Sequence, residues 1–263
     1  MSKKIKIIVI AVTSLLLIGA GIFAVPKAVN KYELIKIEKE NEKTLETVQK
    51  ELQTAGQTEQ GSALANEPIE PTSTKSPESS ALLSVPFICQ APLQTEENWK
   101  YHEESCEEAA VLQAYLYETG QTMTKQQANE EILKMIEWEK GFFGEHRDIY
   151  ADDVKKLING YYEIPMDKIE IVYKATLENI KNFVSQGHPV IVPIMGNILK
   201  NPYYPYPGYH MLTVIGFTED KIITNDNGTR HGEKYSYNND IFLEAMTAAG
   251  GDIVVIKTKT TNF

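Results

Sequence analysis

The sequence predicts an α+β fold in which helices pack on a mostly antiparallel sheet. Segments with helical patterning come first along the chain, and runs of β-branched residues bounded by turn residues follow them. Helices grouped before strands, instead of alternating with them, indicate this class. The predicted helices cover residues 105–117, 125–138, 151–158 and 177–186, and the predicted strands cover residues 190–194, 211–217, 221–225 and 253–258, with a further strand beginning in residues 82–90.

Capping and breaking residues bound these helices. Ser105, followed three residues later by Glu108, has the spacing of a capping box in front of an apolar run. Gly187 and Pro189 end the segment at 177–186, because neither residue continues a helix readily. The helix at residues 125–138 places three apolar side chains on one side: Ile132, Leu133 and Ile136.

An uncharged apolar run occupies residues 7–25, directly after the lysines of residues 3–6. A helix of these 19 residues is about 28 Å long, close to the hydrocarbon thickness of a bilayer. The run exceeds the usual core of a cleaved signal peptide, and Pro26 spoils the candidate cleavage site ending at Ala28. We therefore expect residues 1–30 to form a transmembrane anchor or uncleaved signal, with a cleaved signal as the alternative.

The charges around this run predict its orientation. Basic residues before an apolar segment favour the cytoplasmic side, which puts the rest of the chain outside. We therefore expect a single-pass protein of the cell membrane whose folded domain is extracytoplasmic.

Three further regions follow the anchor. Residues 31–53 are rich in Glu and Lys and contain no Pro or Gly, which predicts a polar helical stalk whose oligomeric state stays open. Residues 54–80 are mostly Thr, Gln, Ser, Glu and Pro, which predicts a disordered linker. Residues 81–263 form the folded domain and hold the whole acidic excess, because residues 1–80 carry ten lysines and ten glutamates. A net charge of −10 argues against nucleic acid as a partner.

Cys106 is the candidate nucleophile. If Ser105 is the N-cap, Cys106 is the first helical residue, and the positive end of the helix lowers the pKa of its thiol. A lowered pKa favours the thiolate, which is the attacking species in covalent catalysis. A small buried cysteine, or one half of a disulfide, is the alternative interpretation.

The partners expected for this nucleophile lie on both sides of it in the chain. His210 begins an apolar strand after a loop rich in Pro and Tyr, and it suits the role of general base. Asp226 follows the next strand and would orient the imidazole, with Asn225 as the competing residue. Gln90, which ends the first strand, would donate its amide to an oxyanion together with the Cys106 backbone N–H.

Four motifs occur in order along the folded domain: VPFICQ at residues 85–90, SCEEAA at 105–110, GYHMLTVIGF at 208–217 and TND at 224–226. In order, spacing and local context they resemble the peptidase C39-like family of the papain-like cysteine peptidase clan, which is similar to bacteriocin-processing peptidase domains. The resemblance covers residues 81–258 and implies a papain-like fold. It also implies a set of roles: nucleophile Cys106, general base His210, orienting residue Asp226 and oxyanion donor Gln90.

The motifs depart from the family pattern in two places. The family has Gly-Pro after the nucleophile, whereas this chain has Glu107 and Glu108, whose charges oppose ionisation of the thiol. Asn227 stands where a proline usually follows Asp226. Both departures leave the substrate preference open. The stretch at residues 228–235 looks like that of bacterial membrane-anchored members.

Cys89 is the second of the two cysteines. Because it neighbours Gln90, a disulfide between Cys89 and Cys106 is sterically conceivable and would silence the nucleophile. The five histidines are scattered, without metal-ligand spacing to either cysteine. We therefore expect no metal and no cofactor.

The leading hypothesis is a membrane-anchored cysteine peptidase that hydrolyses a peptide or protein substrate through a thioester acyl-enzyme. A cell-wall amidase or endopeptidase shares the order of cysteine before histidine, but its histidine usually follows sooner than the gap of 104 residues seen here. A catalytically silent module of the same fold, binding peptide or glycan, is the rival from another functional class.

Overall fold

The computed structural model describes residues 31–54, 80–204 and 208–259. The expected anchor at residues 1–30 and nearly all of the expected linker lie outside these residues. Residues 31–54 are helical and are described on their own, and their role as a stalk stays a prediction. Within the described part of the chain, no helix combines the length and the hydropathy needed to cross a membrane.

The described residues of the folded domain contain one sheet of seven strands, and every neighbouring pair is antiparallel. The strand order is β2-β7-β3-β4-β5-β6, and the short strand β1 pairs with the end of β4. The strands are β1 (Ala81–Leu82), β2 (Ile169–Val172), β3 (Val190–Met195), β4 (Tyr209–Phe217), β5 (Lys221–Asn225), β6 (Tyr235–Asn238) and β7 (Ile253–Ile256).

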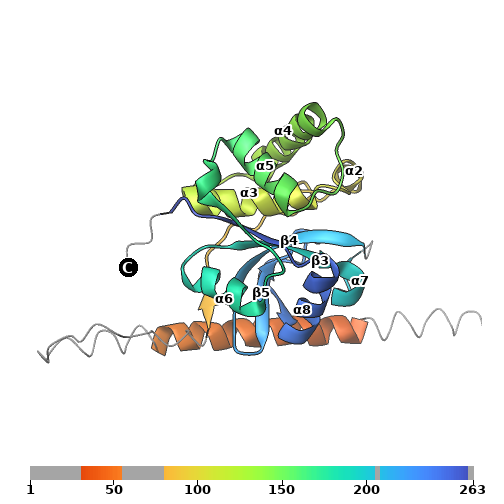
Figure 1. The fold of residues 1–263 in the computed structure, drawn as a ribbon. Coiled ribbons are helices and arrows are strands. Elements are labelled where there is room, and N and C mark those ends of the chain that lie inside the picture. Colours follow the sequence, from red (N-terminus) through yellow and green to blue (C-terminus); the bar gives the residue numbers. More distant parts are fainter. Residues whose placement is uncertain (1–30, 55–79, 205–207, 260–263) are drawn as a thin grey trace, which may run out of the picture. The chain divides into compact units, whose positions relative to one another are not determined.

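Helices cover both faces of this sheet (Figure 1). One face carries α3 (Cys106–Thr119), which packs against β3, β4 and β7, and beside it α2 (Glu96–Tyr101), α4 (Lys125–Phe143) and α5 (Ala151–Tyr162). The opposite face carries α6 (Leu177–Ser185) and α8 (Asn239–Ala248), with α7 (Gly196–Leu199) next to α8. A short 3-10 helix, η1 (Met166–Lys168), precedes β2.

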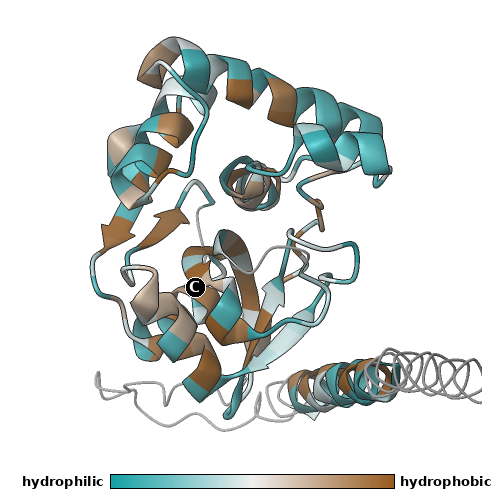
Figure 2. Cartoon of the chain, turned by 90° about the vertical axis from the view of Figure 1, so that its right-hand side faces the viewer, coloured by the Kyte–Doolittle hydropathy of each residue, from teal (hydrophilic) through white to brown (hydrophobic). Residues whose placement is uncertain are grey.

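Helix α3 lies in the core of the domain. Every residue from Cys106 to Ala114 is buried, and small side chains such as Ala109 and Ala110 let the helix approach the sheet closely. The Thr213 hydroxyl of β4 donates to the Ala110 carbonyl oxygen at 3.2 Å, which ties helix to strand. Figure 2 shows hydrophobic residues along the strands and alternating hydrophilic and hydrophobic stretches along the outer helices. The start of α3 is therefore held by the core and not by a loop.

A glycine in β4 fixes the start of the segment that leads to Gln90. Gly216 pairs with Leu82 of β1, at a point where the register between β4 and β5 shifts. A Cβ atom at Gly216 would lie 2.6 Å from the Ala81 carbonyl oxygen, so a side chain here would push β1 away. Beyond β1, the Leu83 amide donates to the Ile215 carbonyl oxygen at 2.8 Å, and regular pairing ends.

The predicted α+β class with an antiparallel sheet is confirmed, while several boundaries differ. The helices predicted at 125–138 and 151–158 continue to Phe143 and Tyr162. The strand predicted to begin in residues 82–90 is confined to Ala81–Leu82. The elements α2, η1, β2, α7, β6 and α8 were not predicted. For β2 one reason is that its strand partner, β7, is distant in the sequence.

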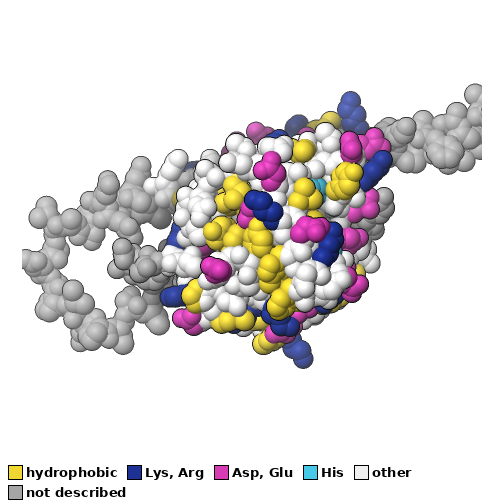
Figure 3. All heavy atoms as spheres, turned by 90° about the horizontal axis from the view of Figure 1, so that it is seen from above, with side chains coloured by type: hydrophobic (Ala, Val, Ile, Leu, Met, Phe, Trp, Pro, Cys, Tyr) yellow, Lys and Arg dark blue, Asp and Glu magenta, His cyan; other side chains and the backbone are white. Residues whose placement is uncertain are grey.

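The outer surface of the helical layer mixes charges of both signs. Figure 3, seen from that side, shows acidic and basic side chains interspersed around groups of hydrophobic ones. Some large apolar side chains of this layer are exposed, among them Leu133 and Phe142 of α4. This face therefore presents no field of a single sign to a charged partner.

Candidate active site

Cys106 is the first residue of α3, and Ser105 is its N-cap, as the sequence predicts. The predicted capping box is wrong, because the Ser105 side chain makes no capping hydrogen bond. Ser105 has φ −104° and ψ 29° instead of the extended conformation of a capping serine, and its Oγ lies 3.3 Å from His102 Nδ1. Glu108 does not reach back to the cap, since its Oε1 lies 2.8 Å from His146 Nε2.

The Cys106 thiol is buried and donates to Glu107 Oε2 at 3.0 Å. Burial is the main reason that its pKa lies well above the usual range, and the negative charge of Glu107 raises it further. The backbone N–H of Met211 acts in the opposite direction but does not outweigh these effects. The lowered pKa expected from the helix dipole is therefore absent in this arrangement, and the resting state is a protonated thiol.

His210 and Asp226 form a hydrogen-bonded pair. His210 lies in β4 opposite Ile194 of β3, and Asp226 directly follows β5, the next strand of the sheet. His210 Nε2 is 3.1 Å from Asp226 Oδ1, and both residues are buried. Because Nε2 faces the carboxylate, Nδ1 is the ring nitrogen left for another partner.

Four further donors hold the Asp226 carboxylate. Tyr204 Oη donates to Oδ2 at 2.6 Å, Asn201 Nδ2 at 3.1 Å, and the Tyr237 hydroxyl donates to the same oxygen. The Gly228 amide donates to Oδ1 at 3.2 Å. Burial alone would raise the pKa of Asp226, but the bonds from His210 and the two tyrosines outweigh it and hold the pKa below its usual range. The carboxylate is thus ionised where it faces the imidazole.

Asn225 points away from the histidine. Its Nδ2 donates to the Val85 carbonyl oxygen at 3.0 Å, and its Oδ1 accepts from the Lys234 amide at 3.2 Å. Successive side chains of an extended segment point in opposite directions, so only one of the two neighbours can face His210. Of the two residues that the sequence left open, Asp226 is the one in contact with the imidazole.

Gln90 lies at the same site, but its amide is already engaged. Nε2 donates to the His102 carbonyl oxygen at 2.8 Å and to the Glu103 carbonyl oxygen at 3.0 Å. The Gln90 backbone amide donates to the Asn227 carbonyl oxygen at 2.9 Å, which places Gln90 beside the turn after β5. Its role as an oxyanion donor stays a prediction that requires one of these amide bonds to be exchanged.

The two cysteines of the chain are free thiols and do not form the conceivable disulfide. Burial raises the pKa of Cys89 to about 11, so this thiol is unreactive near neutral pH. The backbone of Cys106 is instead tied to the turn after β5, since Asn227 Nδ2 donates to the Cys106 carbonyl oxygen at 2.9 Å. Asn227, the departure from the family pattern, therefore links the two halves of the site.

Cys106, His210 and Gln90 open onto one cavity of about 1100 Å³. The lining combines aromatic, acidic and basic side chains: Trp99, Tyr203, Tyr204, Tyr209, Glu96, Glu103, Glu104, Asp148, Lys100, Arg230 and His231. Asp226 lies behind His210 and does not line the cavity. Burial, followed by the hydrogen bond between Asp148 and the neighbouring carboxylate of Glu104, raises the pKa of Asp148 to about 6.

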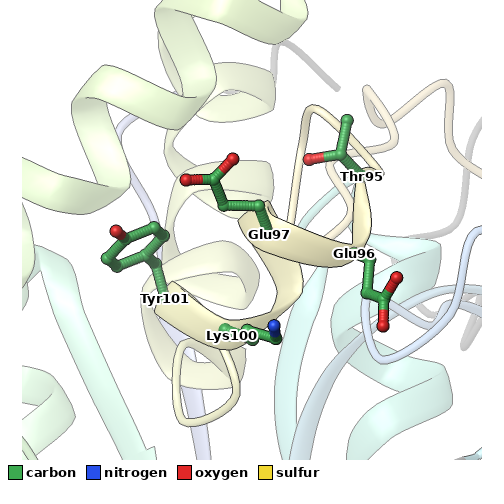
Figure 4. Close-up of a pocket in the computed structure, with 5 residues that line it drawn as sticks. All are labelled: Thr95, Glu96, Glu97, Lys100 and Tyr101. Carbon is green, nitrogen blue, oxygen red and sulfur yellow. The ribbon is translucent and has the colours of Figure 1, made fainter.

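A second hollow lies along the exposed side of α2. The side chains that border it radiate from the helix and do not converge on one point: Thr95, Glu96, Glu97, Lys100 and Tyr101 (Figure 4). All five are exposed, and none is a nucleophile paired with a base. The hollow therefore has no arrangement for covalent chemistry.

Sequence patterns missed most of the residues that support the histidine. Asn201 and Tyr204 come from the Pro- and Tyr-rich loop that precedes His210, and Tyr237 comes from the unpredicted strand β6. Gly228 packs on the imidazole, since a Cβ atom there would lie 2.8 Å from His210 Cε1. The Asn227-Gly228 pair after Asp226 is typical of a turn, but it does not identify the ring that packs against the glycine.

Comparison with known proteins identifies the family. The sequence model of the Peptidase_C39 like family matches residues 82–251. A crystal structure of a Bacillus anthracis protein, provisionally described as a C39-like peptidase, is similar with a TM-score of 0.49 and 14% identity, covering 69% of this chain and 98% of that one. No curated protein matches the chain. Since the family match spans more than half of the chain and includes Cys106, His210 and Asp226, this protein belongs to the Peptidase_C39 like family.

Proposed function

We propose that this protein is a membrane-anchored, extracytoplasmic cysteine peptidase. Cys106 is the nucleophile, His210 the general base, Asp226 the orienting residue and Gln90 an oxyanion donor. The observation that carries the proposal is that Cys106 and His210 line one cavity, while a buried carboxylate holds the far side of the imidazole. Membership of a peptidase family makes hydrolysis of a peptide or protein the natural reaction.

The first step moves a proton and forms a bond. The Cys106 thiol turns from Glu107 Oε2 to His210 Nδ1, which takes the proton, and the sulfur attacks the scissile carbonyl carbon. The negative charge then develops on the carbonyl oxygen, where the Cys106 backbone N–H and the Gln90 amide would stabilise it. His210 returns the proton to the departing amine, and the acyl group remains on sulfur as a thioester.

The second step restores the enzyme. His210 takes a proton from a water molecule, which attacks the thioester carbonyl carbon, and the sulfur leaves as thiolate. The proton returns from His210 to sulfur, and the product departs as a carboxylic acid. Through both steps Asp226 stabilises the charged imidazolium, because it remains ionised next to Nε2.

The cavity lining favours some peptides over others. Its acidic side chains outnumber its basic ones, and three tyrosines offer flat aromatic surfaces. We therefore place neutral or basic peptide segments with aromatic or aliphatic side chains ahead of acidic segments as substrates.

Selective alkylation tests the nucleophile. The full chain carrying Cys89→Ala, so that Cys106 is the sole thiol, would be treated with iodoacetamide at one neutral pH, with and without His210→Ala. We expect His210→Ala to slow alkylation by about tenfold or more, because the base no longer draws the thiol proton. Equal rates in the two chains would refute the pairing of Cys106 with His210.

Peptide-library digestion tests the reaction. Wild-type chain should cleave peptides, and Cys106→Ala should reduce cleavage to the background rate. The hydrogen bond from the thiol to Glu107 favours one second candidate, a silent peptide-binding module, because it holds the nucleophile protonated. Peptide binding by both chains with cleavage by neither would establish that alternative.

Membrane fractionation tests the location. The run at residues 7–25 supports an anchor, so full-length chain should sediment with membranes and resist extraction by alkaline carbonate. An external protease should digest the domain in intact spheroplasts. Recovery of a shortened chain in the medium would instead indicate a cleaved signal peptide.

A further inference from the structure

A second cluster of reactive side chains lies next to the candidate active site but outside its cavity. Glu108 is in the first turn of α3, Glu139 is near the end of α4, and His146 follows α4 in the connection to α5. One ligand-type atom from each residue lies within 4.8 Å of the corresponding atoms of the other two. None of the three lines the cavity of Cys106 and His210.

The carboxylates of this cluster are buried without donors. Glu108 and Glu139 are each 1% exposed, and all four of their carboxylate oxygens lack a hydrogen-bond partner. Glu108 Oε1 is 2.8 Å from His146 Nε2, but the pair does not have hydrogen-bond geometry. Among the described residues, no Lys or Arg side chain lies within ion-pair distance of either carboxylate.

Such an arrangement is costly without a further partner. Buried polar groups are normally paired, and a buried carboxylate without a donor or a counterion destabilises the fold. Here two carboxylates and an imidazole nitrogen converge on the same point from three different segments. A single partner that accepts lone pairs from two oxygens and one nitrogen at once is a metal cation.

We propose that Glu108, Glu139 and His146 bind a divalent transition-metal cation of the zinc class. Zinc ligands of this kind lie about 2.0–2.2 Å from the ion, so small shifts of the three side chains would close the site around it. The imidazole argues against calcium and magnesium, which prefer oxygen ligands alone. The expectation of no metal, drawn from sequence spacing, is revised by this proposal, because the ligands are contributed by separate elements.

The cation would hold the start of the nucleophile helix in place. It would join α3 to α4 and to the connection that carries Asp148 and Ile149. The Ile149 amide donates to Glu107 Oε1 at 2.9 Å, and the other oxygen of Glu107 accepts from the Cys106 thiol. Asp148, in the same connection, lines the catalytic cavity. The role of the ion is therefore structural, and it contacts no reacting atom.

Zinc binding to the full chain in mild detergent tests the site. The chain would carry Cys106→Ser, so that the thiol in the cavity cannot capture the ion. Competition with a coloured chelator would give the stoichiometry and affinity of zinc binding. We expect one zinc per chain and a higher midpoint of thermal unfolding when zinc is present. Manganese should bind more weakly, and calcium should not compete.

Ligand variants separate this site from any other zinc site. Glu139→Gln and His146→Gln should each weaken zinc binding by more than about tenfold, since even partners outside the ligand set cost this much. Glu137→Gln, at an exposed position of the same helix, should bind zinc like its parent. His146 lies outside the helices. If Glu139→Gln does not fold, zinc binding by His146→Gln decides whether these residues hold the ion.

Two results would overturn the proposal. One is the absence of stoichiometric zinc binding, which would leave Glu108 and Glu139 as a buried carboxyl pair that shares a proton. The other is zinc that binds Glu139→Gln and His146→Gln as tightly as the parent. Neither result bears on the peptidase proposal, which is tested separately by peptide cleavage and by alkylation of Cys106.

Discussion

The two halves of the candidate active site differ in how their polar atoms are paired. On the histidine side, Asp226 accepts from His210, two tyrosines and an asparagine, so the carboxylate is ionised and fixed. On the cysteine side, the thiol donates to Glu107, and burial and that neighbouring charge keep it protonated. The comparison teaches that the imidazole of His210 is already held as the proposed base would need, whereas the thiol of Cys106 rests in a hydrogen bond that keeps it protonated.

Loss of the Asp226 carboxylate should have the largest effect. Asp226→Ala would leave three side-chain donors and the imidazole without their buried acceptor, and we expect a loss of about 3–5 kcal/mol in the free energy of unfolding. Urea denaturation of the full chain measures it. The exposed residue Asp240, in the first turn of α8, provides the control: Asp240→Ala should cost less than about 1 kcal/mol. If Asp226→Ala lowers the unfolding free energy no more than Asp240→Ala does, the Asp226 carboxylate is not the buried acceptor that holds His210 and its neighbours.

Crowding the imidazole should disturb the base while leaving its partners intact. Gly228→Ala places a Cβ atom 3.0 Å from His210 Nε2 and 2.8 Å from Cε1, so the ring must shift. We expect kcat/KM for peptide cleavage to fall by about 10- to 100-fold, because displacement of a catalytic group by about 1 Å has effects of this size.

The matched glycine control is in α4. A Cβ atom at Gly141 meets nothing within 4 Å, so Gly141→Ala should leave cleavage unchanged and stabilise the helix by about 0.5–1 kcal/mol. Equal activity of the two alanine variants would contradict the tight packing of Gly228 on His210.

Replacement of the Glu107 carboxylate beside the thiol should make Cys106 easier to ionise. Glu107→Gln keeps the size of the side chain but removes the carboxylate that accepts from the Cys106 thiol and raises its pKa. We expect alkylation of Cys106 at neutral pH to become faster by about tenfold, which corresponds to about 1.4 kcal/mol in favour of the thiolate. A rate equal to or below that of the parent would show that Glu107 does not restrain the nucleophile.

The smallest expected effect is a change of the unfolding free energy with pH in the acidic range. The pKa of Asp226 in the folded chain lies below its usual range, so its contribution is complete above the unfolded value of about 3.9 and is lost as the pH falls toward the folded value. The difference in unfolding free energy between wild type and Asp226→Asn should therefore be constant at neutral pH and shrink below about pH 4. If this difference in unfolding free energy already shrinks between pH 7 and pH 5, the titration of a group other than Asp226 is responsible.

Local sequence patterns were sufficient for the main catalytic candidates. A serine before a cysteine at the start of an apolar helical run indicated the first residue of α3. An apolar strand beginning with histidine, and an aspartate after the next strand, indicated the pair that the antiparallel sheet brings together. Each of these signals depends on neighbours within a few residues, which is why it could be read from the chain.

What only the tertiary structure decided concerns contacts between distant segments. The selection of Asp226 over Asn225, the engagement of the Gln90 amide, and the convergence of Glu108, Glu139 and His146 all depend on how separate elements pack. The sequence by itself determined the α+β class, the helix start at Cys106 and the strand that carries His210. Periodicity and capping act over a single turn or strand, whereas the direction and pairing of a buried side chain are set by the elements around it, and these are brought together only when the whole domain folds.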